Sequence, residues 1–411
     1  MDGEILFLTH RVPFPPNRGD RIRSWHLLRA LATLAPVHLG ALVEFGERRI
    51  VPEPVAAITA SSHLGVRPRS IGLAGLAALV RQQPVSVLAF ASRSLRAWVA
   101  QTLATRPIAT IVVFSGQMAQ FVPPWFAGRV VMDFVDVDSA KFAAYADTAK
   151  SGLVRWIHAR EAKGLAAWEE RVAHRAALSL LITGEERDLF AARLADRPGV
   201  GRAVRLAVLG NGIDHRAFDP AAVWPEPSLA AGGPWLVFTG QMDYPPNITA
   251  VSLFARAVMP QIRWHYPDAR FAIVGRAPTA EVRALGAIEG VQVTGEVADV
   301  RPWLAGAAVV VAPLTIARGV QNKVLEAMAM ARAVLLTPAA ATGIGGRDGE
   351  HFVLAGDVDA LAARALDLIA DPARRAELGA AARRFVVDHA GWDAVLAPLA
   401  AMIRPEPTDA A

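Results

Sequence analysis

The sequence predicts an α/β fold made of two domains, each built around a parallel β-sheet, and three observations support this prediction. Short apolar runs such as residues 4–9 and 235–239 end in loops with glycine or proline, and segments with helical periodicity follow them. The chain has 411 residues, which is long for one hydrophobic core. Glycine, asparagine and proline gather over residues 210–234, where we expect a boundary. We therefore predict a first domain over residues 1–210 and a second over residues 211–385.

The composition is that of a globular protein, with 53% hydrophobic and 20% charged residues. Cysteine is absent, which excludes a disulfide framework and a thiolate metal site and fits a reducing cytosol. The N-terminal apolar run is too short for a signal peptide, and no uncharged apolar run of about 18 residues predicts a transmembrane helix. We therefore expect a cytoplasmic protein. The lack of an export signal disfavours a periplasmic binding protein.

Positive charge is concentrated in the first half of the chain. Residues 1–210 contain 26 Lys and Arg against 17 Asp and Glu, whereas residues 211–411 contain 17 against 21. Residues 54–132 contain seven arginines and no acid, interleaved with apolar and aromatic side chains such as Trp98 and Trp125. This pattern predicts contact with an anionic membrane surface. Nucleic acid is disfavoured because no nucleic-acid-binding motif accompanies the basic residues, and an ordinary solvated face is the alternative.

The first strand is predicted over residues 4–9, followed by a proline-rich loop and a helix from about residue 22 to 34. Gly19 is the only glycine of this loop, so the GxGxxG pattern of dinucleotide-binding proteins is missing and NAD is disfavoured. Arg18, Arg21 and Arg23 cluster at the carboxyl end of the strand, where α/β sheets bind anionic ligands. The alternative is that these arginines lie on a solvated surface.

Further strands of the first domain are predicted over residues 36–43, 108–114, 130–135, 178–183 and 204–209, with an arginine-rich helical stretch between the first two. Asp136 and Asp138 follow the third of these strands and could form a DxD pair that holds Mg²⁺ or Mn²⁺. We prefer an interpretation without metal, in which Asp136 hydrogen-bonds an acceptor or sugar hydroxyl. The alternative is a helix N-cap by Asp138 or Ser139.

Residues 151–177 form a long helical pattern with several arginines and with Trp156 and Trp168. We predict a surface helix there, with lipid as a candidate partner. In the second domain, strands are predicted over residues 235–239, 271–274, 291–297, 309–312 and 334–337. Residues 358–402 are predicted to be helical, and the tail over residues 405–411 is predicted to be disordered.

The stretch from Pro313 to Ala331 is the most informative part of the chain. An apolar strand ends at Pro313, and the apolar residues of the next segment recur at helical spacing: Val320, Val324, Met328 and Ala331. Glu326 is the only charged residue between Lys323 and Arg332, and a carboxylate among apolar side chains needs a polar partner. One interpretation is an ion pair of Glu326 with Lys323 or Arg332.

The other interpretation is a nucleotide site. Gly319 and Glu326 lie seven residues apart, which is about 10 Å along a helix and matches the length of a nucleotide diphosphate. Free amides at the start of the helix would bind the phosphates. Glu326 would accept hydrogen bonds from the two ribose hydroxyls.

The wording of this stretch resembles the signature of retaining glycosyltransferases of family 4, which have the GT-B fold. In that family two glutamates eight positions apart flank the start of such a helix. Glu326 matches the second, which binds the ribose, whereas Arg318 occupies the place of the first, which contacts the transferred sugar. Arg318 therefore suggests a cation beside the diphosphate. The segment ARGVQNKVLEAMAM also resembles sugar transferases of PEP-CTERM exopolysaccharide systems.

The resemblance extends over nearly the whole chain and implies further positions. The loop with Gly19 resembles the first loop of the N-terminal GT-B domain, and VLGNGIDHRAFDP resembles the hinge between the domains. Gln241 and Asn247 stand at or near the places of a family arginine and lysine that bind the diphosphate, so Arg276, Arg318 and Lys323 are the candidate cations. Val297 or Leu314 would contact the base. The remaining expected donor-binding residues are Arg18, Gly240, Gly275, Gly319 and Val320.

The resemblance implies a GT-B protein with two Rossmann-like domains that face each other across a cleft, and a final helix over residues 386–404 that returns to the first domain. The expected activity is retaining transfer of a hexose from a UDP- or GDP-sugar, with Asp136, Arg318 and Glu326 as catalytic residues and without metal or other cofactor. The expected acceptor is a glycan or lipid-linked glycan of exopolysaccharide synthesis at the inner face of the cell membrane. The alternative is a non-catalytic scaffold that binds nucleotide sugars.

Overall fold

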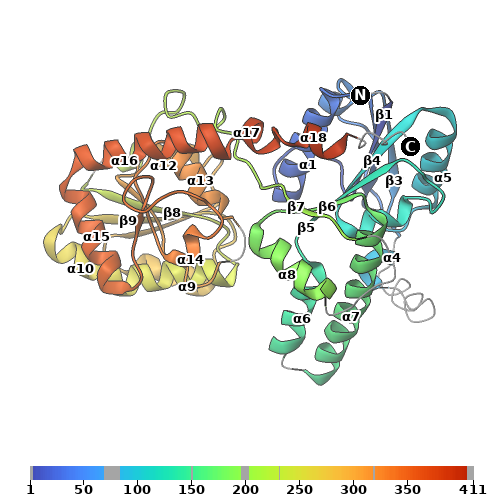
Figure 1. Cartoon of the computed structure of the whole chain (residues 1–411). Helices are drawn as coiled ribbons and strands as arrows, with labels where there is room; N and C mark the ends of the chain where they lie inside the picture. Colours follow the sequence, from blue (N-terminus) through green and yellow to red (C-terminus); the bar gives the residue numbers. More distant parts are fainter. Residues whose placement is uncertain are drawn as a thin grey trace. The chain divides into compact units, whose positions relative to one another are not determined.

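The computed structural model describes residues 3–68, 84–149, 151–195, 203–230, 232–317 and 320–404. The chain divides into two compact units (Figure 1). The first comprises residues 1–210 and 396–411, and the second comprises residues 211–395. Arg318, Gly319, part of the acid-free arginine stretch and the predicted disordered tail lie outside the described residues.

The first unit is organised by a parallel sheet with the order β3-β2-β1-β4-β5-β6-β7 in the described part of the chain. Its strands are β1 (Glu4–Thr9), β2 (Val37–Val43), β3 (Ser61–Val66), β4 (Ile108–Phe114), β5 (Arg129–Val135), β6 (Leu178–Leu181) and β7 (Leu206–Val208). The inner strands are apolar on both faces because helices cover both sides of the sheet. Only β3 was not predicted, because its Ser-Ser-His start gives no continuous apolar run at this edge of the sheet.

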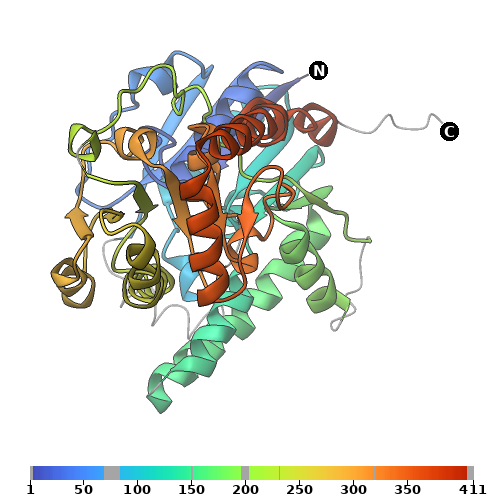
Figure 2. The ribbon, with the colours of Figure 1, turned by 90° about the vertical axis from the view of Figure 1, so that its left-hand side faces the viewer.

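Helices connect these parallel strands, as is usual for parallel sheets. They are α1 (Gly19–Ala32), α2 (Glu53–Ala56), α4 (Val85–Leu88), α5 (Arg93–Thr105), the short 3₁₀ helix Gly116–Phe121, α6 (Asp138–Thr148), α7 (Gly152–Arg175) and α8 (Gly184–Ala195). The pair α6 and α7 forms a hairpin that extends away from the sheet of its own unit (Figures 1 and 2). Helix α7 confirms the helix predicted over residues 151–177.

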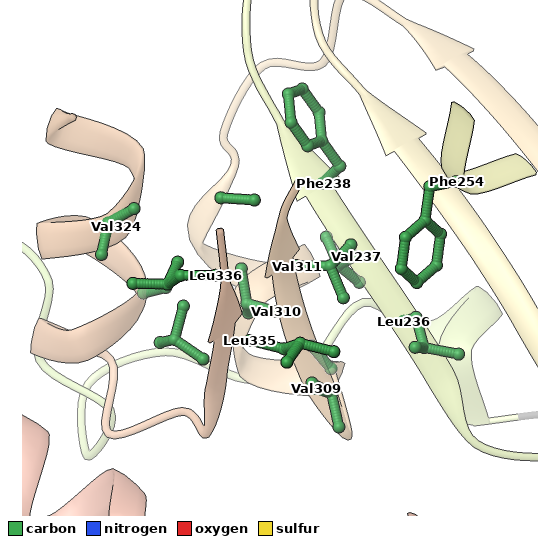
Figure 3. Packing of buried hydrophobic residues seen from close by; sticks show 14 of the residues in the cluster. Leu236, Val237, Phe238, Phe254, Val309, Val310, Val311, Val324, Leu335 and Leu336 are labelled. Atoms are coloured by element: carbon green, nitrogen blue, oxygen red, sulfur yellow. The ribbon is translucent and has the colours of Figure 1, made fainter. Parts of the chain in front are cut away.

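The second unit contains a parallel sheet with the order β10-β9-β8-β11-β12-β13 among the described residues. Its strands are β8 (Trp235–Thr239), β9 (Arg270–Val274), β10 (Val291–Gly295), β11 (Val309–Ala312), β12 (Val334–Leu336) and β13 (Val353–Leu354). Figure 3 shows the apolar side chains of β8, β11 and β12 packed together. Val324, from the helix that connects β11 to β12, lies beside Leu336. One core cluster therefore joins the central strands to the helix that carries Glu326.

The helices of the second unit lie on both faces of its sheet (Figure 1). They are α9 (Pro245–Leu253), a π turn (Phe254–Val258), α10 (Met259–His265), α11 (Ala280–Ala284), α12 (Arg301–Gly306), α13 (Asn322–Ala329), α14 (Pro338–Ala341), α15 (Val358–Ala370) and α16 (Pro372–Phe385), besides short 3₁₀ helices at Pro227–Ala230 and Leu285–Ala287. Helix α13 begins at Asn322, so only part of the span from Gly319 to Glu326 is helical. The rise of about 10 Å expected for a continuous helix therefore does not apply.

The C-terminal segment continues through a π turn (Val386–Ala390), α17 (Trp392–Leu396) and α18 (Leu399–Ile403). Trp392 packs against Gly212, where an added Cβ would lie 2.8 Å from the tryptophan, and Ile213 bridges to Gly391. These contacts keep residues up to Val395 with the second unit. Beyond Leu396 the chain joins the first unit, where the carbonyls of Met402 and Ile403 accept hydrogen bonds from Arg129 and Thr110.

Candidate active site

The strand order of the second unit indicates where a ligand would bind. The chain runs from β8 outward to β9 and β10 and then returns on the other side of β8 as β11 and β12. Parallel α/β sheets bind ligands at such a reversal, at the carboxyl ends of the two central strands. The residues that follow β8 and β11 are therefore the first candidates: those from Gly240 to Asn247, and the described residues 313–317, 320 and 321.

Two glycines allow the loops after β8 and β9 to approach each other closely. Gly275 has a φ of 153°, and a Cβ added there would lie 1.6 Å from the carbonyl oxygen of Gly240. A Cβ added at Gly240 would lie 2.9 Å from the Asn247 amide nitrogen and 3.3 Å from Lys323 Nζ. Gly275 is therefore required by the fold itself, and Gly240 leaves room for polar side chains beside it.

Those polar side chains form a connected network. Lys323 Nζ, on α13, donates to Asn247 Oδ1 at 2.5 Å, and Asn247 Nδ2 donates to the Gln241 carbonyl at 2.8 Å. The ammonium lies 4.6 Å from the centre of the Phe238 ring. On the rim, Arg276 donates to the Gln241 side chain at 3.0 Å. The network holds one cation from α13 and one from the β9 loop at the same end of the sheet.

Asn247 therefore has a different role from the predicted one. Its side chain is 4% exposed and both of its polar atoms are bonded within the protein. It positions Lys323 and the β8 loop through these two hydrogen bonds. Arg276 and Gln241 are exposed, and their contact with a ligand stays a prediction.

Glu326 lies one turn after Lys323 on α13 and is half buried. No hydrogen bond or ion pair of its carboxylate occurs within the described residues. The alternative ion pairs are not formed, because Lys323 bonds Asn247, and Arg332 Nε donates to the Met330 carbonyl at 3.0 Å. Burial raises the pKa of Glu326 to about 7, which Lys323 partly opposes. Burial likewise lowers the pKa of Lys323 to about 8, against the influence of Glu326.

The other predicted donor residues differ in their accessibility. Leu314 is 1% exposed and belongs to the core, so it cannot offer the predicted apolar face to a base without rearrangement. Val297 and Val320 are half buried at the edge of the same core and remain accessible. Arg318 and Gly319 lie between Ala317 and Val320, outside the described residues.

The sheet of the first unit reverses between β1 and β4. His10 follows β1, stacks on Phe114 at the end of β4 with ring centres 5.5 Å apart, and lies 3.1 Å from Asp20 through Nε2. Arg11 donates to the same carboxylate at 2.5 Å. These hydrogen bonds, from His10 first, lower the pKa of Asp20 despite its partial burial. The sequence did not reveal this cluster, because its members lie ten residues apart across an irregular loop.

The arginines of the first loop separate into two roles. Arg18 is exposed next to Gly19, where an added Cβ would meet nothing within 4 Å. Both are accessible. Arg23 was predicted as an anion ligand, but it is 1% exposed and bonds Asp133 at 2.9 Å and 3.2 Å. Its guanidinium also donates to the carbonyls of Leu209 and Gly210, so it fixes the last residues of the first unit before the chain enters the second.

Asp136 and Asp138 share a lysine. Lys141 Nζ lies 3.3 Å from Asp136 Oδ2 and 3.1 Å from Asp138 Oδ1, and although burial opposes it, the two carboxylates raise the pKa of this lysine. The preceding residue, Val135, has a φ of 70°, an uncommon conformation for a β-branched residue that is often found near functional sites. Within the described residues no group of three or more His, Cys, Asp or Glu could hold a metal ion.

The start of α6, just after these acids, is capped by carboxylates from other helices. Glu169 of α7 accepts from the Ser139 amide at 2.9 Å and from its hydroxyl, and Glu186 of α8 accepts from the Val137 amide at 2.9 Å. The alternative interpretation, a helix N-cap by the side chain of Asp138 or Ser139, is therefore wrong. Burial raises the pKa of Glu169 to about 7, with the bonds from Ser139 opposing. The caps hold the turn that presents Asp136.

Comparison with known proteins assigns the class. Residues 233–371 match the family described as Glycosyl transferases group 1. The search of curated proteins gave no match. Among solved structures, the chain is similar to sucrose-phosphate synthase of Thermosynechococcus elongatus, with 17% identity, a TM-score of 0.63 and coverage of 97% of this chain and 98% of that one.

Two further solved structures are similar over comparable lengths. Anabaena HepE in complex with UDP-glucose has 16% identity and a TM-score of 0.63, with coverage of 97% of this chain and 99% of that one. WaaG, a glycosyltransferase involved in lipopolysaccharide biosynthesis, has 17% identity and a TM-score of 0.62, with 98% and 100% covered. The chain thus has the GT-B fold, and the match to the group 1 glycosyltransferase family lies within its second unit. None of the described helices is both long and apolar enough to cross a membrane.

Proposed function

We propose that the protein transfers a hexose from a UDP- or GDP-sugar to a hydroxyl of an acceptor glycan. The observation that carries this proposal is the carboxylate of Glu326, half buried on α13 and without a hydrogen-bond partner in the described part of the chain, beside the positioned ammonium of Lys323. A buried carboxylate is costly unless a ligand satisfies it. The group 1 domain and the UDP-glucose bound to HepE support a nucleotide sugar as that ligand.

The residues then take distinct roles. Glu326 accepts hydrogen bonds from the ribose hydroxyls, and Val297 contacts the base. Lys323, Arg276 and Arg318 supply positive charge to the diphosphate, because two phosphate charges in a protected crevice need paired cations. Gly240 and Gly275 keep the loops close enough for backbone amides to reach the phosphates. Gly319 and Val320, which precede α13 in the sequence, complete the set of donor-binding residues that we propose.

The proposed chemistry depends on stabilising the departing diphosphate, whose charge develops as the glycosidic bond to the donor breaks. We expect retention of anomeric configuration, as in the family that the sequence resembles. Asp136, held by Lys141, accepts a hydrogen bond from an acceptor or sugar hydroxyl, and no metal is required. Arg18 and Gly19 approach the donor or the acceptor from the first unit.

The acceptor that we propose is a glycan on a lipid carrier, assembled for exopolysaccharide at the inner face of the cell membrane. The basic excess of residues 1–210 supports an anionic surface as partner. The similarity to WaaG and the resemblance to PEP-CTERM sugar transferases are consistent with such a substrate. The protein would then be cytoplasmic and peripheral to the membrane.

The test is a panel of UDP- and GDP-hexoses. A cognate donor should raise the melting temperature by mass action, by an amount that grows with its concentration. It should also be slowly hydrolysed or transferred in the presence of EDTA. A panel without any thermal shift would contradict the proposal, and turnover that EDTA abolishes and Mn²⁺ restores would contradict the metal-free mechanism.

A second candidate function is a non-catalytic scaffold that binds nucleotide sugars. Arg318, Gln241 and Asn247 favour it, because all three depart from the donor-site residues of the family that the sequence resembles. The two candidates differ in chemistry and not in binding. Donor binding without release of nucleotide diphosphate, with or without added acceptors, would identify the scaffold.

A further inference from the structure

The exposed tip of the α6–α7 hairpin carries a cluster of large apolar side chains that are exposed to solvent in the described structure. Its members are Tyr145 at the end of α6 and Leu153, Val154, Trp156 and Ile157 in the first turns of α7. Trp156 is 57% exposed and Leu153 is 68% exposed. Among the residues of α7, all of which are described, none before Glu161 is buried. Exposed apolar clusters of this kind mark interaction sites.

The hairpin is anchored at its base and held together beneath its tip. Glu161 accepts from the amides of Val85 and Ser86 at the start of α4, at 3.0 Å and 2.8 Å. Closer to the tip, the rings of Phe142, Tyr145 and His158 lie with centres 5.8 Å apart and pack α6 against α7. The apolar tip is therefore presented on a rigid support that extends away from the sheet of its unit (Figures 1 and 2).

The order of side chains along α7 is that of a helix entering a lipid surface. Leu153, Trp156 and Ile157 share one stripe at spacings of three and four residues. Lys163, exposed on α7, follows Trp156 by seven residues, which is about 10 Å toward the base. The apolar residues at the end of the hairpin suit the acyl chains of a bilayer. The amphipathic tryptophan suits the membrane interface, and the cations one to two turns behind it suit anionic headgroups.

Charge near the tip also favours an anionic partner. From Tyr145 to Lys163 the sequence carries four Lys and Arg and two acids. One of these acids, Glu161, is buried and bonded to α4, which leaves Asp147 as the exposed one. A second protein is a less suitable occupant, because a convex tip of about two turns is smaller than the roughly 800 Å² per partner of a stable protein interface.

The acid-free arginine stretch predicted from the sequence is a weaker candidate. Its arginines in the described residues largely face protein groups: Arg106 pairs with Glu4 at 2.7 Å, Arg67 lies 3.6 Å from Glu44, and Arg129 donates to the Met402 carbonyl. Acids from elsewhere in the chain therefore offset a charge that seemed unopposed in the sequence. Trp125 is the only large apolar side chain of the stretch that is strongly exposed in the described residues.

We propose that the tip of the α6–α7 hairpin inserts into anionic lipid bilayers and docks the protein on the membrane. This deepens the proposed function, since it rests on the membrane-bound acceptor suggested above and identifies the surface that reaches it. The arrangement requires no conformational change, because the apolar residues are already exposed at the end of an anchored hairpin.

The test uses vesicles of phosphatidylcholine with and without phosphatidylglycerol. The full chain should sediment with the anionic vesicles, and Trp156→Ser/Ile157→Ser should lower its partition coefficient at least tenfold. Trp264→Ser, which removes an 84% exposed tryptophan from the second unit, should leave partitioning unchanged. The thermal shift with nucleotide sugars should be the same in all these proteins. A loss of nucleotide binding in every protein with vesicle binding retained would remove the proposed function and leave this inference standing.

The absence of cysteine allows a direct positional readout. An environment-sensitive fluorophore on Ile157→Cys should shift to the blue with anionic vesicles and be quenched by nitroxide lipids, whereas the same probe on Trp264→Cys or Trp125→Cys should not respond. A response at position 125 with none at position 157 would overturn the inference. Failure of the wild-type chain to bind anionic vesicles would also overturn it. If the wild-type chain self-associates without binding vesicles, and Trp156→Ser/Ile157→Ser abolishes that self-association, the tip is an interface between copies of the chain.

Discussion

Burial disfavours the charged forms of both Glu326 and Lys323. The carboxylate of Glu326 has its pKa raised to about 7 and the ammonium of Lys323 has its pKa lowered to about 8, in each case chiefly by burial. Natural proteins keep such residues mainly at functional sites. Both pKa values therefore lie close to neutral pH in the free protein, so the charges of the site should change with small changes in pH.

We predict a bell-shaped pH dependence of donor affinity. Affinity should increase as the pH rises through about 7, because Glu326 must be ionised to accept two hydroxyl hydrogen bonds. It should fall above about 8, because Lys323 then loses its positive charge, which we propose pairs with the diphosphate. Titration with an intact nucleotide sugar avoids the phosphate monoester of a free nucleotide, which itself titrates near about 6. A flat profile between pH 6 and about 8.5 would contradict the assigned roles.

At the residue scale the sequence identified the group but not its surroundings. Glu326 could be predicted because it stands alone among apolar residues in a helical pattern. The bond from Lys323 to Asn247 joins residues 76 positions apart and has no local signal. Leu314 was predicted as a ligand contact because apolar residues in a loop and in the core look alike. His10 with Asp20, and Lys141 with its two acids, depend on loop geometry that spacing does not reveal.

At the scale of the element, the loops after β8 and β9 keep their positions only if their backbones can approach each other closely. We predict that Gly275→Ala destabilises the second unit by about 3 kcal/mol or more, since its Cβ would overlap the Gly240 carbonyl and its φ is unfavourable for alanine. The melting transition that responds to nucleotide should fall by roughly 6–12 °C.

Gly19→Ala is the matched control, because the added methyl group meets nothing and Gly19 begins a helix. Its melting temperature should stay within about 2 °C of the wild type. If a ligand approaches the Gly19 backbone, this substitution should weaken ligand binding without loss of stability. Wild-type stability for Gly275→Ala would show that the two loops can separate freely.

Elements with a continuous apolar run were predicted well, and those without one were not. Strands β1, β4, β8 and β11 follow directly from their hydrophobic pattern. Strand β3 was missed because a serine-rich edge strand lacks that pattern. The start of α13 was placed too early, because Val320 continues the helical spacing although it precedes the first helical residue, Asn322.

At the scale of the whole molecule, alternating strands and helices predicted two parallel sheets, and both are present. The strand order could not be read from the pattern, and it is this order that places the reversal between β8 and β11 and so indicates the candidate donor site. The return of the chain to the first unit at Leu396 likewise depends on tertiary contacts, because Trp392 packs on Gly212 of the second unit. The candidate residues could thus be predicted from their chemistry, whereas their arrangement depends on the strand order, which only the structure shows.

The central claim is that Glu326 binds the ribose of a nucleotide sugar, and a double-mutant cycle between protein and ligand tests it most directly. Titration calorimetry would compare UDP or GDP, whichever the panel selects, with its 2′-deoxy analogue on the wild type, Glu326→Gln and the exposed control Glu281→Gln.

Glu326→Gln should weaken binding of the ribonucleotide by about 1.5–3 kcal/mol, roughly ten- to a hundredfold, whereas Glu281→Gln should not. Removing the 2′-hydroxyl should weaken binding to the wild type and to the control, but have a smaller effect on Glu326→Gln, because the neutral amide oxygen of glutamine is a weaker acceptor for that hydroxyl than the carboxylate. If the 2′-hydroxyl contributes the same factor to the wild type and to Glu326→Gln, then Glu326 does not contact the ribose and the assignment of the donor site is wrong.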